Sequence, residues 1–209
     1  DRATMLELAA ERGGDPERAG KRDPLDPLLW RGMREGEPTW PSAVGEGRPG
    51  WHIECSVIAS ELLELPLTVN GGASDLIFPH HEFTAGHTAA LTGREHSLVY
   101  SHAGLVSYQG EKMSKSLGNL VFVSRLLDEG IDARAIRLVL LAQHYRTDWE
   151  YTDALLHAAQ ARLSSWSDWA RNAVEGAGTL TTELRFVLPH DLDTPSALAA
   201  IDARVAAGA

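Results

Sequence analysis

The sequence predicts an α/β fold followed by an α-helical bundle, and three observations support this. Strand-like and helix-like segments alternate from Trp51 to about Tyr145. From Thr152 onward the chain is rich in Ala and Leu with a helical period. Residues 1–50, by contrast, are polar and rich in Pro and Gly. The chain has 209 residues, of which 44% are hydrophobic and 23% charged, so it can bury a sizeable core.

We expect residues 1–50 to be a connecting segment. A short helix is predicted for residues 3–12, and a long stretch with little periodicity follows it. This stretch is predicted to run over the surface as a strap. Its apolar side chains are expected to hold it against the core: Leu25, Leu28, Leu29, Trp30 and Trp40.

Helices and short strands are then expected in alternation. Helical spacing predicts helices at 53–65, 80–91, 123–129, 133–144 and 154–174, and another helix after DLDTPSALAA. Asp193 or Thr194 is expected to cap that last helix, with Pro195 in its first turn. Apolar, β-branched runs predict strands at 67–70 and 98–108, and residues 76–78 form a second short apolar run.

Composition excludes several classes of protein. A net charge of −10 argues against a broad nucleic-acid surface. No apolar run is long enough to span a membrane, and no signal peptide opens the sequence. A single cysteine excludes an internal disulfide framework, so we expect a reducing, cytoplasmic setting. The sequence begins at Asp1, directly in helix-like residues, so we expect a piece of a longer protein.

Cys55 has two interpretations. A lone cysteine in a reducing setting is most often a small buried hydrophobe. It is alternatively a metal ligand, together with His80 or His81 at the start of a predicted helix. One thiol and one imidazole do not complete a structural zinc site, so a further ligand from elsewhere or an open position for substrate would be needed.

The turn NGGASDLIFPHH (70–81) is a candidate ligand site. Gly71 and Gly72 follow a predicted strand and allow a ligand to approach the backbone closely. Asp75 could accept hydrogen bonds from a ribose. A tight turn capped by Asp75 explains the same residues equally well.

The stretch GEKMSKSLG (110–118) carries Lys112 and Lys115 on a glycine-flanked loop. Two ammonium groups there suit a polyphosphate, because they neutralise the charge of a leaving pyrophosphate. A mobile loop can close on ATP and open to release product. A solvated surface turn is the alternative.

These stretches resemble a known family. Lys112-Met113-Ser114-Lys115-Ser116 is similar to the signature loop of class I aminoacyl-tRNA synthetases. GRPGWHIECS (47–56), GGASDLIFPHHE (71–82) and HYR (144–146) resemble the cysteinyl-tRNA synthetase branch. The resemblance implies the C-terminal half of a Rossmann-like (HUP) catalytic domain at 51–120, with the signature loop. Residues 121–209 would be its helical stem-contact and bundle region.

Three features favour a subfamily of this branch, the ligases of mycothiol biosynthesis that join L-cysteine to glucosaminyl-inositol. ERGGDP (11–16) resembles a segment typical of those ligases. Thr84 stands where the synthetases have a Glu zinc ligand, and Asn70 where they usually have a His. The sequence also ends without room for a full anticodon-binding domain, so tRNA is not the expected acceptor. A cysteinyl-tRNA synthetase fragment and a non-catalytic, zinc-binding half remain the alternatives.

The resemblance implies roles for individual residues. Cys55 and His80 would bind a zinc ion that selects cysteine, and a second Cys would come from an N-terminal half that is absent here. Trp51 would line the cysteine pocket, and Lys112 and Lys115 would stabilise pyrophosphate. The remaining ATP contacts would come from Ala73, Ser74, Asp75, Val106, Met113, Ser114 and Ser116. A minor role is expected for His102.

The implied reaction is amide-bond formation driven by conversion of ATP to AMP and pyrophosphate, through cysteinyl-adenylate. Two departures from the family pattern bear on it. Ala73 replaces the third glycine of the usual triplet, and the HIGH-type motif that binds ATP phosphates is missing. We therefore expect the chain alone to be inactive. The other histidines are expected at the surface or behind the site: His87, His96, His144, His157 and His190.

Overall fold

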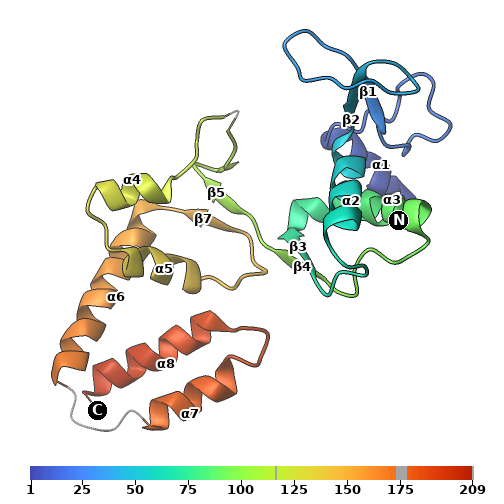
Figure 1. Ribbon diagram of the computed structural model, residues 1–209. Helices are drawn as coiled ribbons and strands as arrows, with labels where there is room; N and C mark the ends of the chain where they lie inside the picture. Colours follow the sequence, from blue (N-terminus) through green and yellow to red (C-terminus); the bar gives the residue numbers. More distant parts are fainter. Residues whose placement is uncertain (116, 173–177, 209) are drawn as a thin grey trace. The chain divides into compact units, whose positions relative to one another are not determined.

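The computed structural model describes residues 1–115, 117–172 and 178–208. It divides the chain into two compact units, Asp1–Ala103 and Gly104–Ala209 (Figure 1). Both units combine helices with short strands, and the second ends in helices, so the predicted fold class is confirmed. No helix among the described residues is long and apolar enough to cross a membrane. The sequence predicted three regions, 1–50, 51–120 and 121–209, divided by function. The two compact units are divided by contacts, so the three functional regions stay a prediction.

The first unit opens with helix α1 (Arg2–Glu11), and the Asp1 side chain caps it by accepting from the Thr4 amide. The strap contains an antiparallel hairpin of β1 (Trp30–Gly32) and β2 (Gly47–Pro49). Strands of three residues leave no period-two signal, so the sequence did not indicate this hairpin. The predicted anchors are only partly buried: Leu28, Leu29 and Trp40 are exposed, so for them the prediction was wrong.

The rest of this unit places two helices beside a parallel strand pair (Figure 1). Helix α2 (Trp51–Leu62) packs on α3 (Glu82–Thr92), with small side chains such as Ser56 and Ala59 at the contact. Strand β3 (Asn70–Ala73) pairs in parallel with β4 (Tyr100–Ala103).

Two short irregular turns connect β3 to α3. These are η1 (Ser74–Leu76) and η2 (Ile77–His81), and Phe78 inside η2 has a non-helical backbone. The predicted strand at 67–70 is displaced toward the glycines, and Leu67 keeps only an isolated bridge to Ser97.

The second unit contains a three-stranded sheet in the order β6-β5-β7. Strand β5 (Val106–Tyr108) pairs antiparallel with β6 (Glu111–Lys112) and in parallel with β7 (Trp149–Tyr151). The β5–β6 turn has positive φ at both Gln109 and Gly110, which suits a tight two-residue hairpin. The signature loop therefore begins on a hairpin strand.

Helices make up the rest of the described part of this unit: α4 (Val123–Asp128), α5 (Ala133–Leu141), α6 (Asp153–Asn172), α7 (Gly178–Val187) and α8 (Thr194–Ala207). The core forms where α5, α6, α8 and β7 meet, around Leu138, Val139, Tyr151, Leu156, Ala159 and Leu198. Asp193 caps α8, and Pro195 lies in its first turn, as predicted. The last two residues of the predicted helix at 154–174 lie outside the described residues, and α7 was not predicted.

Candidate functional site

The first turn of α2 lies against the imidazoles of η2. The Trp51 ring stacks on His80 with centroids 4.0 Å apart and planes 23° apart. The Nδ1 atoms of His52 and His80 are 2.9 Å apart, so one donates a hydrogen bond to the other. Gly50, which precedes the helix, has no room for a Cβ because the Leu28 carbonyl oxygen occupies that space. Gly50 thus lets the strap approach the start of α2, and the rings of Trp51 and His52 both contact His80.

Cys55 lies one turn further along α2 and is half-buried. Burial raises the pKa of its thiol, the charge of Glu54 raises it further, and a side-chain hydrogen bond with Trp51 opposes the rise. Without a cation nearby, the thiol therefore stays protonated at neutral pH. A bound metal would deprotonate it.

Cys55 and His80 both border the Trp51 ring, and a thiolate with an imidazole is a donor pair that zinc prefers. The pair fits part of a zinc site. Among the described residues, no group of three or more His, Cys, Asp or Glu side chains is placed to hold a metal. The predicted zinc site thus stays a prediction that requires another ligand.

Several imidazoles gather around this point. Burial is the main cause that lowers the pKa of His52 and of His81 to about 4, and neighbouring imidazoles lower it further. Burial also lowers the pKa of His80, so these rings are neutral at pH 7. The His81 Nδ1 lies 2.8 Å from the His102 Nε2, so His102 is a hydrogen-bond partner of His81.

The candidate ribose-binding residues lie at the carboxyl end of β3. Ala73 ends the strand, and Ser74 and Asp75 form the short turn after it. This edge of a parallel sheet is where α/β folds commonly bind ligands. A Cβ on Gly72 would lie 2.7 Å from the His81 Cε1, whereas nothing lies within 4 Å of one on Gly71. Packing therefore requires glycine at position 72, whereas Gly71 borders open space.

The signature loop lies in the second unit, with Lys112 at the end of β6 and Lys115 exposed beyond it. Asn119 ties the loop together: its Oδ1 accepts from the Ser114 amide at 2.8 Å, and its Nδ2 donates to the Lys112 carbonyl at 3.2 Å. Sequence reasoning missed Asn119. An amide-bearing side chain directly after Gly118, at the end of the loop, was the available signal.

The other predicted residues of this unit have different surroundings. Met113 and Val106 are partly buried and pack against the core of the second unit. Ser116 lies outside the described residues. The predicted contact of Val106 with an adenine and that of Met113 with ATP stay predictions.

Thr84 is buried in the contact between α2 and α3. Its carbonyl accepts a hydrogen bond from the Ser56 hydroxyl at 2.9 Å, and its own hydroxyl donates to the His52 carbonyl at 3.5 Å. The side chain that replaces the synthetase Glu is therefore part of the helix packing. His96 is also buried, 2.8 Å from the Thr88 hydroxyl, so it is not a surface residue.

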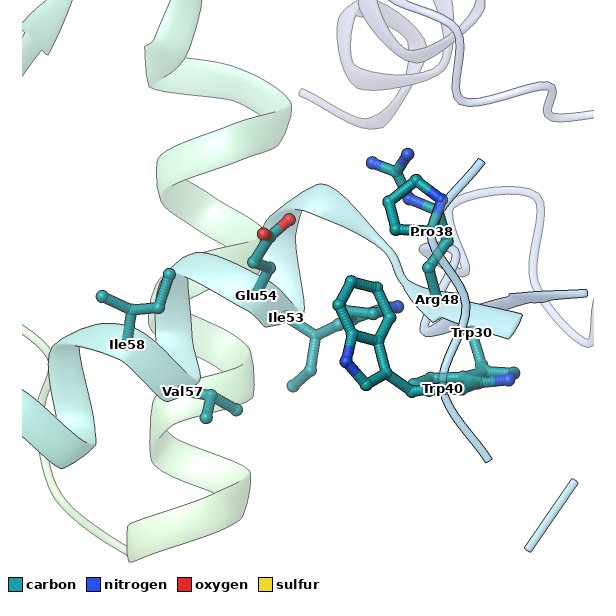
Figure 2. Close-up of a pocket in the computed structure, with 9 residues that line it drawn as sticks. Trp30, Pro38, Trp40, Arg48, Ile53, Glu54, Val57 and Ile58 are labelled. Carbon is teal, nitrogen blue, oxygen red and sulfur yellow. The ribbon is translucent and has the colours of Figure 1, made fainter. Parts of the chain in front are cut away.

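A pocket of about 510 Å³ lies elsewhere on the first unit, between α2 and the strap (Figure 2). Trp30 and Trp40 form one side, and Ile53, Glu54, Val57 and Ile58 of α2 form another. None of the predicted site residues lines it. The pocket is therefore separate from the candidate site.

Comparison with known families and proteins places these observations in context. A model of the tRNA synthetases class I (C) catalytic domain matches residues 3–161. The chain is 64% identical, over its whole length and 50% of the relative's, to the L-cysteine:1D-myo-inositol 2-amino-2-deoxy-alpha-D-glucopyranoside ligase of Clavibacter michiganensis. A relative of the same name from Clavibacter sepedonicus is 63% identical, over 100% of this chain and 53% of the relative. Another, from Nocardiopsis dassonvillei, is 56% identical, over 97% of this chain and 50% of the relative.

The chain therefore spans about half the length of the curated relatives it matches. Among solved structures, it is similar to the Agrobacterium radiobacter K84 agnB2 LeuRS in a ternary complex with tRNA and LeuAMS. The TM-score is 0.54 at 17% identity, over 80% of this chain and 29% of that one. At this identity, the similarity concerns the fold alone.

Proposed function

The chain belongs to the family of class I tRNA synthetase (C) catalytic domains, and we propose that it is part of an ATP-dependent cysteine ligase. The proposed enzyme activates L-cysteine and transfers it to the amine of glucosaminyl-inositol, a step of mycothiol biosynthesis. The observation that carries this proposal is the 56–64% identity, along almost the whole chain, to proteins named L-cysteine:1D-myo-inositol 2-amino-2-deoxy-alpha-D-glucopyranoside ligase.

Thr84 supports a ligase over a tRNA synthetase. In the synthetases, the corresponding Glu is expected to complete the zinc site. Here the Thr84 hydroxyl donates to the His52 carbonyl, and a short neutral side chain of this kind is a poor zinc ligand. A site with one ligand fewer fits the ligase family.

The first proposed step is adenylation. The carboxylate of cysteine attacks the α-phosphorus of ATP, the bond to the bridging oxygen breaks, and pyrophosphate leaves with its electron pair. The ammonium groups of Lys112 and Lys115 would stabilise the charge on that leaving group. Ala73, Ser74 and Asp75 would hold the ribose at the end of β3, and Val106 would contact the adenine.

The second proposed step is acyl transfer. The amine of the amino sugar attacks the acyl carbon, the bond from that carbon to the phosphate oxygen breaks, and AMP leaves. The amine gives up a proton as the amide forms. Neither step needs an oxidant or a reductant.

Cys55 and His80 would hold the zinc ion, and Trp51 contacts both side chains. When bound, zinc would coordinate the thiolate of cysteine and so distinguish it from serine, whose hydroxyl is a poorer ligand. The stacking of Trp51 on His80 and the hydrogen bond between His52 and His80 hold this imidazole in place in the structure. A further ligand would come from an N-terminal half that is outside this chain.

Pyrophosphate exchange tests the adenylation step. In the full-length protein, we expect exchange between ATP and pyrophosphate that depends on cysteine and is not supported by serine. Replacing Lys112 or Lys115 by Ala should lower kcat by about 100-fold, because each removes a charge that stabilises the transition state. Arg125→Ala removes another exposed cation of the same unit and should leave kcat unchanged.

The 209-residue chain should show no exchange, because no HIGH-type motif is present in its sequence. Exchange by this chain alone, or full activity in both lysine variants, would contradict these assignments.

A further inference from the structure

Arg12 links two parts of the first unit that are far apart in sequence. Its Nη1 donates to the Asp75 carbonyl at 2.8 Å and also to the Phe78 carbonyl. Both acceptors belong to the turns η1 and η2, which connect β3 to α3. One side chain at the end of α1 therefore holds the segment that presents Asp75 at one end and His80 at the other.

This segment needs an external donor. The non-helical backbone of Phe78 interrupts the regular hydrogen-bond ladder between β3 and α3. Carbonyl groups in such an irregular stretch must find donors elsewhere, and a charged guanidinium gives stronger hydrogen bonds than a neutral donor. Arg12 itself is exposed, so water competes for its donors and weakens the net contribution of these bonds. Their effect is local, because they restrict the conformations of residues 74–81.

The ERGGDP segment (11–16) forms a tight turn directly after Arg12. Gly13 has a φ of +79°, which ends α1 in a left-handed turn. The Gly14 amide then donates to the Ala9 carbonyl at 2.7 Å, and a Cβ on Gly14 would lie 2.8 Å from that same oxygen. The Lys21 Nζ donates to the Gly14 carbonyl at 2.5 Å and to the Pro24 carbonyl at 3.0 Å. The glycines and the lysine together fix the turn beside Arg12.

We propose that Arg12 is a positioning residue of the proposed ligase. The inference rests on the proposed function, since it assigns Asp75 to the adenylate and His80 to the metal. By holding the carbonyls of Asp75 and Phe78, Arg12 sets the geometry in which both side chains meet their ligands. ERGGDP is then the support of the nucleotide and cysteine site, and Arg12 does not itself touch substrate.

Hydrogen exchange on the 209-residue chain tests the structural half of this proposal without substrate or metal. Arg12→Ala should speed exchange of the amides in residues 74–81 by about tenfold or more, because the loop loses two tethers. Arg12→Lys keeps a cation with several donors and should restore part of the protection. Arg2→Ala is the matched control: it removes the Arg2–Asp23 ion pair of the same helix but touches no residue of the loop. Equal exchange at 74–81 in Arg12→Ala and Arg2→Ala would overturn the proposal.

Kinetics on the full-length protein test the functional half. Arg12→Ala should lower kcat/KM for ATP in cysteine-dependent exchange by about 10- to 100-fold, since misplacement of a site by an ångström costs this much. Arg12→Lys should recover part of that loss, and Arg2→Ala should match the wild type. Faster loop exchange with unchanged kcat/KM would overturn the positioning role. Absence of exchange in the wild-type enzyme itself would instead contradict the proposed function, and hydrogen exchange would still decide whether Arg12 holds the loop.

Discussion

Gly71 and Gly72 are neighbours in the sequence, but their surroundings differ. A Cβ at position 72 would press against the buried His81 ring, which is held by its hydrogen bond to His102. The same atom at position 71 would meet nothing within 4 Å. The sequence indicated the glycine pair as a place of close approach. It could not indicate that one of the two approaches a side chain of the protein itself.

Gly72→Ala should therefore destabilise the first unit by about 2 kcal/mol, the usual range for overpacking a filled site. Gly71→Ala should change the free energy of unfolding by no more than about 0.5 kcal/mol. Urea unfolding followed by tryptophan fluorescence measures both. If the two variants are equally stable, the packing of His81 on Gly72 is not as described.

His96 makes stability depend on pH. Burial lowers its pKa below the ordinary value of 6.5, so the folded state holds the neutral ring and the unfolded state takes up a proton first. The free energy of unfolding should therefore be highest above about pH 6.5 and fall as the pH drops below it. His96→Gln can still hydrogen-bond to Thr88 but does not titrate, so its stability should fall less between about pH 7 and about pH 5. An identical fall in wild type and variant would contradict this role of His96.

At the scale of the element, the long helices followed from their periodicity, with ends that differ by a few residues. The short strands did not. The single strand expected at 98–108 is two strands, β4 and β5, separated at Gly104. A Cβ there would collide with the backbone of Thr147 and Asp148, a contact that depends on residues far along the chain. The same limit applies to Arg12, whose partners Asp75 and Phe78 lie more than 60 residues further along the chain.

The signature loop should depend on Asn119. Asn119→Ala removes the acceptor of the Ser114 amide and the donor to the Lys112 carbonyl, so the loop should open more often. Limited trypsin digestion after Lys112 and Lys115 should speed up by about tenfold, since cleavage requires an open loop. Asn172→Ala removes an exposed amide whose Nδ2 donates to the Asp168 carbonyl within α6, and it provides the control. Equal cleavage rates in the two variants would show that Asn119 does not hold the loop.

At the scale of the molecule, the candidate residues fall into two sets, one in each unit. Trp51 stacks on His80 and hydrogen-bonds with Cys55 in the first unit, and binding of one zinc ion by Cys55 and His80 stays a prediction. Lys112 and Lys115 lie on a loop of the second unit. The sequence indicated these residues because their motifs are short and local. A metal site with ligands from separate segments is not determined by either segment alone. Among the described residues, no group of three or more His, Cys, Asp or Glu side chains is placed to hold a metal.

The acceptor that the full-length protein uses distinguishes a ligase of glucosaminyl-inositol from a tRNA synthetase. We would incubate the full-length protein with ATP and L-cysteine, and measure AMP formation with either glucosaminyl-inositol or tRNA as the acceptor. We expect turnover with the amino sugar and none with tRNA. Turnover with tRNA alone would contradict it, and would assign the chain to a cysteinyl-tRNA synthetase in which Thr84 and ERGGDP carry no meaning for the acceptor.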